Sequence, residues 1–414
     1  MMSNEPSWLE FFQDRERLHA DYYLTFAQEN ARRDPEAYDR LEAENGNLLK
    51  TAAWLAEQNE AERILNLASA LWEKSDFLRT RGFMQRGLPL LEQACQAAQQ
   101  LGDAHSEFTW LGALADTHYA INPALTPPLY EQALALAEYM AEPQLKAQAY
   151  LGMGRLQMDM GHLEQAALWL EKSLHEYCQC QDHEGEIKSL VTLGNLLSLQ
   201  GDFNRAVSYL EQGLSLVEFR QDRNGEALLY NALGYTAALA QDWPEAVRYY
   251  EVSANLARTI GDRYLEVRGL HNLGEAWLAL EDVQKAVSLL EEVLVRQEPI
   301  DDVLTKAFTH FYLGKAYYML DDPERSLAQL RLVYIFRQIP LIVDLMAETA
   351  WMEANNYLKQ NKIDLARTAL LEVLNITPDH MVDLRQNAEM LLEVIENGVY
   401  AIEKFERHVR GNER

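Results

Sequence analysis

One short residue pattern recurs six times along this chain at a fixed 40-residue step, with no insertion between copies. Each copy begins with a small residue, which we call the anchor. A second small residue follows 12 positions later, and a large apolar residue stands four positions after that. A period of this length predicts stacked supersecondary units, each of which buries its apolar side against its neighbours. The anchors are Gly154, Gly194, Gly234, Gly274, Gly314 and Ala354.

The columns of the repeat predict two antiparallel helices per unit, A and B, and an all-α fold. Small residues allow helices A and B to approach closely, and the large residue fills the space beside them. Accidental periodicity in one long helical bundle is the alternative, but several phase-locked columns argue against it. Asp or Asn in the turns can cap the first amides of the next helix. Such residues stand within units at Asp202, Asp242, Asp282, Asp322 and Asn361, and between units at Asp182, Asp222, Asp262 and Asp302.

The pattern of Leu-Gly, a later aromatic or Leu, Gly-Asp and then Ala resembles the tetratricopeptide (TPR) repeat. That resemblance implies a right-handed α-α superhelix, a TPR solenoid, whose A helices line a concave groove. The usual TPR unit has about 34 residues. A 40-residue unit resembles the longer repeats of Pins/LGN-type adaptors and of the TPR sensor regions of bacterial STAND-type regulators.

Four segments follow from the repeat. We expect an N-terminal helical segment over 1–60, two degenerate TPR-like helix pairs over 61–144, six regular units over 145–379, and a C-terminal capping helix and tail over 380–414. Asn122-Pro123 and Pro127-Pro128 are expected to distort the turn of the second degenerate pair. Residues 5–60 resemble the helical stretch that joins the nucleotide-binding module of STAND ATPases to their TPR arrays. The sequence contains no GxxxxGK[ST] loop, so no NTPase is assigned.

The chain is strongly acidic, with a formal net charge of -27. Such a surface repels nucleic acid and anionic membranes, so neither is an expected partner. The first residues lack the basic and apolar regions of a secretory signal, and three cysteines give no disulfide framework. We therefore expect a cytoplasmic protein.

One cluster has spacing like that of a metal site: His175, Cys178, Cys180 and His183. Thiolate and imidazole ligands together suit zinc. Two cysteines separated by one residue on a helix, however, point about 200° apart. Polar residues at a helix end and its turn are the preferred interpretation, and no metal or cofactor is predicted. No nucleophile turn or Gly-rich loop marks a catalytic centre, so the chain is not expected to be an enzyme.

The predicted binding residues lie on helix A, three and two positions before the anchor, one position after it, and one turn earlier. Asn amides can donate to and accept from a peptide backbone, and Arg and Lys can pair with carboxylates. Alternatively, these side chains satisfy one another between adjacent A helices. The predicted set is Arg155, Lys188, Asn195, Asn231, Tyr235, Arg268, His271, Asn272, Glu275, Tyr312, Lys315 and Asn355.

Two functional hypotheses remain open. The first is a non-enzymatic protein-protein interaction scaffold that binds a peptide or helical segment, one with acidic residues, in the groove. The second is a ligand-sensing domain of a bacterial signalling or transcription regulator without its own NTPase. Self-association through an apolar terminal helix is a further option.

Overall fold

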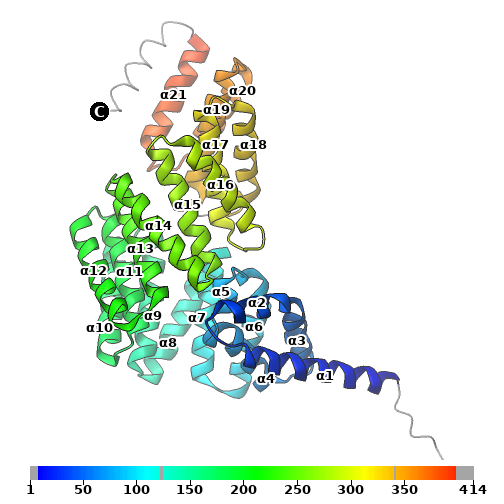
Figure 1. The fold of residues 1–414 in the computed structure, drawn as a ribbon. Coiled ribbons are helices and arrows are strands. Elements are labelled where there is room, and N and C mark those ends of the chain that lie inside the picture. Colours follow the sequence, from blue (N-terminus) through cyan, green and yellow to red (C-terminus); the bar gives the residue numbers. More distant parts are fainter. Residues whose placement is uncertain (1–7, 122–124, 340–341, 398–414) are drawn as a thin grey trace, which may run out of the picture. The chain divides into compact units, whose positions relative to one another are not determined.

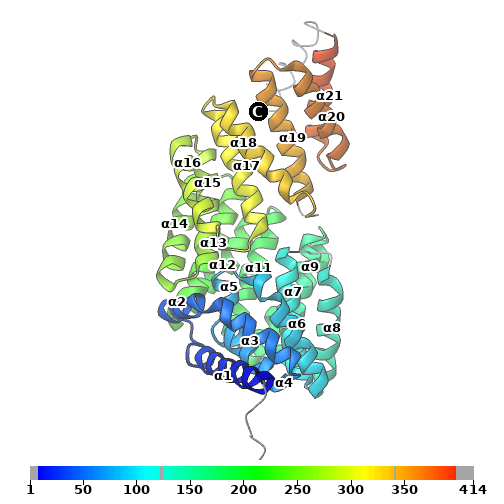
Figure 2. The ribbon, with the colours of Figure 1, turned by 90° about the vertical axis from the view of Figure 1, so that its right-hand side faces the viewer.

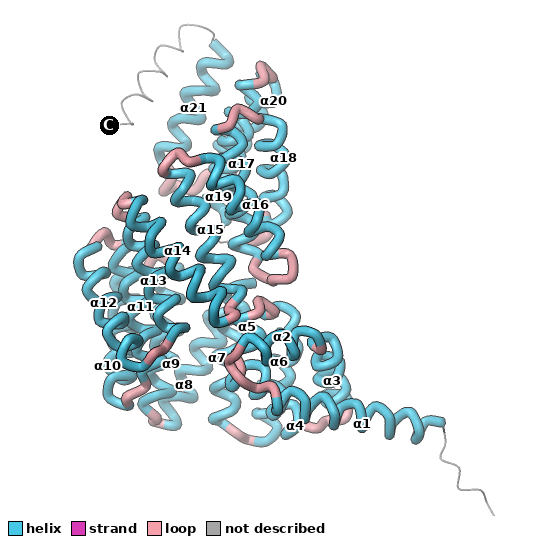
Figure 3. Tube along the Cα trace, viewed as in Figure 1, coloured by secondary structure: helices cyan, strands magenta, loops and turns pink. Residues whose placement is uncertain are grey.

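The computed structural model describes residues 8–121, 125–339 and 342–397, and every regular element in these ranges is a helix (Figures 1 and 3). The chain divides into two compact units. Unit 1 comprises residues 1–269 and 298–301, and unit 2 comprises residues 270–297 and 302–414. The division falls inside α15 (Arg263–Ala279), so it cuts through a repeat.

Unit 1 begins with helices of unequal length and continues with helix pairs. Its N-terminal part holds α1 (Trp8–Glu29), α2 (Pro35–Ala43), α3 (Asn45–Glu57), α4 (Ala61–Ser69), a π-helical turn (Ala70–Lys74) and α5 (Phe77–Thr80). Its pairs are formed by α6 (Met84–Leu101), α7 (Ala104–Ile121), α8 (Thr126–Met140), α9 (Pro143–Asp159), α10 (Leu163–Cys180), α11 (His183–Leu199), α12 (Phe203–Arg220), α13 (Arg223–Leu239) and α14 (Trp243–Ile260).

Unit 2 continues the pairs from the second half of α15, and its B helix α18 is short and is followed by a 3-10 turn (Tyr334–Phe336). The last helix, α21, contacts α19 and α20. The predicted tail from Glu403 to His408 lies outside the described residues. The helices of this unit are α16 (Val283–Gln297), α17 (Val303–Met319), α18 (Pro323–Val333), α19 (Val343–Lys359), α20 (Ile363–Ile376) and α21 (Val382–Asn397).

Close helix packing explains the anchor column and confirms the all-α repeat fold. A Cβ added at Gly194 would lie 2.7 Å from Leu210 Cδ2, far inside van der Waals contact. Ala206 and Leu210 of the other two columns are fully buried. The same clash recurs between Gly154 and Leu170 and between Gly274 and Leu290. A side chain at the anchor would therefore push helices A and B apart.

The predicted Asp caps are confirmed at both kinds of turn. Asp202 and Asp242 accept hydrogen bonds from backbone N–H groups three positions later, at the start of B helices. Asp182 and Asp222 do the same at the start of A helices.

The turn within each unit contains one residue with left-handed backbone geometry, directly before the N-cap of helix B. These residues are Gly161, Gly201, Gln241, Glu281, Asp321 and Asn361. The prediction that Asn361 caps the first amides of helix B is wrong. Asn361 holds the left-handed position, and Lys362 stands at the N-cap without a side-chain hydrogen bond.

The degenerate pair over residues 104–140 keeps regular helices. Pro127 and Pro128 stand in the first turn of α8, where a missing N–H disturbs no hydrogen bond. The predicted distortion at Asn122 and Pro123 lies outside the described residues.

The A helices of unit 1 form its inner face. Successive A helices α7, α9, α11 and α13 contact one another, whereas successive B helices among the described elements of this unit make no comparable contact. A stack in which only one layer is in contact with itself curves towards that layer. We therefore call the surface formed by α9, α11 and α13 the inner face.

None of the helices within the described ranges combines the length and the apolar character needed to cross a membrane.

Candidate functional site

Two asparagines on neighbouring A helices of the inner face carry buried polar atoms without a hydrogen-bond partner. Asn195 lies on α11 and Asn231 on α13, and both are half-buried. Asn195 Oδ1 and Asn231 Nδ2 are buried and have no hydrogen-bond partner in the part of the chain that the structure describes. An unsatisfied buried polar atom costs about 1–3 kcal/mol. This pair therefore marks a place where the fold has retained unused hydrogen-bonding capacity.

A buried hydrogen bond fixes the register of the two helices that carry these asparagines. Ser198 Oγ and Thr236 Oγ1 lie 2.8 Å apart, each within about one turn of Asn195 or Asn231. One hydroxyl donates to the other, which in turn donates to a carbonyl oxygen of its own helix, that of Gly194 for Ser198 or that of Ala232 for Thr236. The register of the two amides along the helix axes is thus fixed.

The predicted basic residues of unit 1 already have partners within the chain. Arg155 Nη1 lies 3.8 Å from a carboxylate oxygen of Asp116. Lys188 Nζ lies 2.8 Å from Glu184 Oε1 in its own helix. Arg268 stacks over the Tyr264 ring at 5.7 Å, and Tyr235 also has an interaction partner.

Four of the predicted residues of unit 2 contact or lie near one another. The Tyr312 hydroxyl donates to Glu275 Oε1 at 2.5 Å. The His271 ring packs edge-on against Tyr312 at 5.6 Å, and its Nδ1 lies 2.9 Å from Thr309 Oγ1. Burial raises the pKa of Glu275, and the Tyr312 hydrogen bond and the Lys315 charge oppose that rise. These residues satisfy one another between adjacent A helices, as the alternative interpretation held.

The other two predicted residues of unit 2 stand apart from that group. Asn355 Nδ2 donates to the carbonyl oxygen of Trp351 in its own helix. Asn272 is half-buried.

Glu348 on α19 was missed by the sequence prediction. Burial raises the pKa of this carboxyl group, while the charge of Lys315 lowers it. The residue stands two repeats after Arg268 and four repeats after Lys188, in the same column. Extending that column through unit 2 would have found it.

The cysteine and histidine cluster shows no arrangement typical of a metal site. His175 Nε2 lies 2.8 Å from Gln179 Nε2, and His183 Nδ1 lies 3.2 Å from Glu186 Oε2. Burial raises the pKa of the Cys178 thiol to about 11, which disfavours the thiolate that zinc requires. Within the described ranges, no group of three or more His, Cys, Asp or Glu side chains is placed to hold a metal ion.

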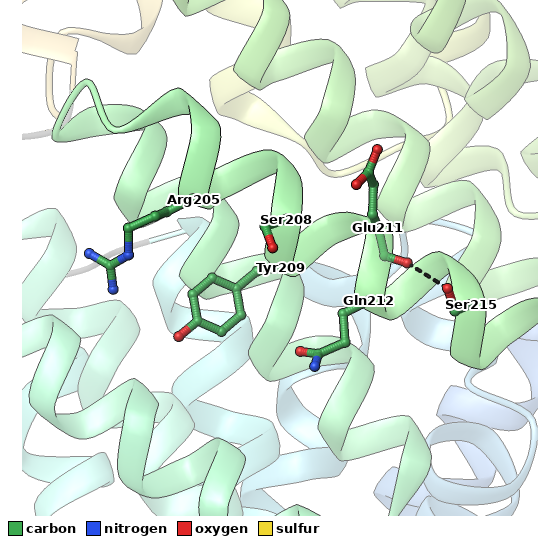
Figure 4. Close-up of a pocket in the computed structure, with 6 residues that line it drawn as sticks. All are labelled: Arg205, Ser208, Tyr209, Glu211, Gln212 and Ser215. Atoms are coloured by element: carbon green, nitrogen blue, oxygen red, sulfur yellow. Dashed lines mark hydrogen bonds between the residues drawn. The ribbon is translucent and has the colours of Figure 1, made fainter.

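A shallow pocket lies on α12, a B helix, and therefore away from the inner face (Figure 4). The hydrogen bond drawn there runs from Ser215 Oγ to the carbonyl oxygen of Glu211, one turn earlier in the same helix. Because one helix supplies the whole lining, no second element encloses a ligand. The lining residues are Arg205, Ser208, Tyr209, Glu211, Gln212 and Ser215.

Comparison with known protein families gives one match. The model of the tetratricopeptide repeat matches residues 187–218, which span most of α11 and α12. No curated protein sequence matches the chain.

Solved structures with a similar fold are TPR proteins of low sequence identity. One is a STAND protein with a TPR sensor from Pyrococcus horikoshii, with a TM-score of 0.60 and 16% identity, over 85% of this chain and 52% of that one. Another is the APC/C hetero-tetramer Cut9–Hcn1, with a TM-score of 0.57 and 19% identity, over 83% and 60%. A third is a Rap protein complexed with Competence and Sporulation Factor, with a TM-score of 0.55 and 13% identity, over 83% and 99%. The chain thus spans little more than half the length of the first two proteins, and these likenesses show the fold alone.

Proposed function

We propose that this chain, a tetratricopeptide-repeat protein, is a non-enzymatic scaffold that binds an extended peptide segment of a protein partner on the inner face of unit 1. The observation that carries the proposal is the pair of unsatisfied amides, Asn195 and Asn231, on adjacent A helices.

The chemistry of the amide side chain favours a peptide backbone as the ligand. An extended peptide presents N–H and C=O groups that must all find partners when they are buried. An Asn amide can donate and accept at once, so it can bind such a backbone whatever the peptide sequence is. Because Ser198 and Thr236 hold α11 and α13 in register, the two amides offer a preorganised pair of contacts.

Charge plays a smaller part in the proposed recognition. Lys188 and Arg155 are the residues that would pair with acidic side chains of the partner. Glu184 and Asp116 already lie beside them, so a partner carboxylate would exchange for an existing one. The net gain from each such exchange is small for partly exposed pairs, and the two asparagines dominate the affinity.

Two structural neighbours support a protein or peptide partner. The Rap neighbour is complexed with Competence and Sporulation Factor, and the Cut9–Hcn1 neighbour is an APC/C hetero-tetramer. The STAND neighbour, whose TPR region is a sensor, favours the second candidate, a ligand-sensing domain of a signalling regulator. Both candidates use the same inner face and differ in whether binding passes a signal to another module.

A random peptide library displayed on phage tests the proposal. Peptides are selected on the full chain, and their affinities for the chain and for Asn195→Ala/Asn231→Ala are measured by calorimetry. Loss of two backbone contacts worth about 0.5–1.5 kcal/mol each should weaken binding by roughly 5-fold to 150-fold.

The control is Tyr209→Ala/Gln212→Ala on the outer pocket of α12. That variant should bind the selected peptides as the unchanged chain does. If the double Asn variant also retains full affinity, or if no peptide is selected above background, the proposed site is wrong.

A further inference from the structure

The N-terminal segment folds back onto turns that lie far along the chain, within unit 1. Arg33, just before α2, lies 3.2 Å from Glu184 in the first turn of α11. At the other end of α2, Glu42 accepts from Arg263 in the first turn of α15, at 2.6 and 2.8 Å. Figures 1 and 2 both place α2 and α5 beside the turn between α14 and α15. The helix α2 therefore bridges the starts of two A helices that are not neighbours in the stack.

The helix of the bridge is somewhat shorter than the stack that it spans, and the ion pairs at its two ends make up the difference. This helix has nine residues, which gives a length of about 13 Å. Between α11 and α15 stands the whole A helix α13, and A helices pack about 8–10 Å apart. A fixed connection of this length therefore constrains how strongly α11, α13 and α15 curve.

The end of the bridge at α15 is held by a group of charged side chains around one buried guanidinium group. Arg81, whose side chain is 3% exposed, pairs with Asp39 at 2.6 Å and with Glu42 at 3.1 Å. Glu42 is thereby shared between Arg81 and Arg263. Arg81 is buried, and the side chains of Glu42 and Arg263 are 25% and 39% exposed, so salt screens these pairs less than it screens a fully exposed pair.

A second contact joins the same end to the turn before α15. Arg79 pairs with Asp76 and lies 3.5 Å from Asp262, whose side chain is buried. Asp262 also caps α15, because its Oδ1 accepts from the backbone N–H of Leu265 at 2.9 Å. One carboxylate thus serves both the repeat and the N-terminal segment.

The end of the bridge at α11 is exposed. The side chains of Arg33 and Glu184 are 44% and 51% exposed. Glu184 is also the partner of Lys188 on the inner face. An exposed pair is weak and salt-sensitive, so the two ends of the bridge differ in strength.

We propose that residues 33–43 form a strap that is anchored permanently at α15 and closes reversibly onto α11 through Arg33 and Glu184. Closing the strap sets the spacing of α11 and α13, and with it the spacing of Asn195 and Asn231. This inference rests on the proposed function, because it makes the strap a regulator of that site.

The strap stabilises the proposed binding site without covering it. Asn195 follows Glu184 on the same helix, about three turns or about 16 Å further along α11. A closed strap therefore stabilises the helix that carries the asparagine without covering it. Any ligand that prefers the closed spacing must in turn stabilise the strap, since coupling between two sites is reciprocal.

Amide hydrogen exchange of the full chain tests the strap without any ligand. In Arg33→Glu, or in the unchanged chain at high salt (about 1 M NaCl, where the Debye length is about 3 Å), exchange of residues 36–43 and 184–188 should rise. A rise of up to about fivefold is expected for losing one exposed ion pair, which is worth about 0.2–1 kcal/mol. Exchange of residues 79–82 and 263–267 should stay unchanged.

The matched control is Arg223→Glu, which disrupts an ion pair between Arg223 and Glu226 inside one helix. Exchange of residues 36–43 should not respond to this change. If it rises equally in Arg33→Glu and Arg223→Glu, or in neither, the strap is refuted while the proposed function is untouched.

Binding tests the regulation separately, with a phage-selected peptide as the probe. Arg33→Glu should weaken that peptide severalfold, and saturating peptide should slow the exchange of residues 36–43 in the unchanged chain. Equal affinity for both proteins, or no slowing, would overturn the regulatory role. If no peptide is selected at all, the proposed function fails, and the exchange experiment still decides whether the strap exists.

Discussion

Two turns at equivalent positions of successive repeats begin with the same Asp-Arg pair but have different surroundings. Asp222 caps α13 by accepting from the N–H groups of Asn224 and Gly225, and Asp262 caps α15 in the same way through Leu265. Arg223 is 63% exposed and pairs within its own helix. Arg263 reaches across to Glu42, which lies near the start of the chain.

The two turns also differ in the residue that directly precedes the capping Asp. Gln221 and Gly261 are equivalent, and both adopt a positive φ, +58° and +77°. A Cβ added at Gly261 would lie 3.3 Å from Pro35, tight against the start of α2. The same turn therefore takes Gln where it is free and Gly where the N-terminal segment passes. The repeat thus sets the backbone geometry of each turn. Contact with the distant N-terminal segment decides which residue the turn can hold.

Removing the capping carboxylate should give the largest difference in stability between the two turns. Asp222→Ala loses a helix cap, which costs about 1 kcal/mol. Asp262→Ala loses a cap and one partner of the largely buried Arg79, so the total cost should reach about 2–4 kcal/mol. Native-state hydrogen exchange in unit 1 measures both values. Equal costs for the two variants would show that the Arg79 contact contributes no stability.

A glycine next to the strap should be less tolerant than one in an open turn. Gly82 and Gly102 have positive φ values of +72° and +67°, but only at Gly82 would a Cβ collide with Ile300, at 2.4 Å from its Cγ2. Gly82→Ala should therefore cost about 2–3 kcal/mol, from backbone strain plus overpacking.

Gly102→Ala is the matched control, with about 1–2 kcal/mol of backbone strain and no collision. Urea denaturation of the two variants gives the comparison. A cost that is the same for both would mean that the Ile300 side chain moves aside freely.

Acid should release the exposed end of the strap. Of the three changes considered, it should cause the smallest loss of stability. Lys188, and then Arg33, lower the pKa of Glu184 from 4.5 to about 2. A carboxyl group with a lowered pKa in the folded state adds stability above its unfolded pKa, and that stability is lost as the pH falls from about 4.5 towards 2. Because Glu184 is half-exposed, we expect a loss below about 1 kcal/mol.

Thermal unfolding between pH 5 and pH 3 checks this expectation. The unchanged chain should lose slightly more stability over this range than Glu184→Gln, which has no carboxylate to protonate. Parallel loss in both proteins would argue against a stabilising role for the Glu184 pairs.

Much of the fold could be predicted because its determinants are local. Gly194 meets Leu210 of the very next helix, and Asp222 caps a helix that begins at the following position. Contacts of this range repeat with the sequence, so the period is enough to reveal the helix pairs, their caps and the columns that form the inner face.

The candidate site was predicted less completely. The columns located Asn195 and Asn231, but they could not show which inner-face residues already had partners, such as Lys188 beside Glu184. Glu348 was missed because its column changes charge from basic to acidic in unit 2. Partner choice depends on rotamers and on distances between helices, which residue types alone do not specify.

Residue order was enough to specify the repeating unit of this protein, its turns and the face on which the predicted binding residues stand. Only the folded stack brings Arg33, Glu42 and Arg79 to the starts of α11 and α15. Such contacts depend on the accumulated curvature of several stacked units. Each unit adds a small rotation to the stack. The total rotation decides which distant residues meet, and no pattern inside a single repeat specifies that total.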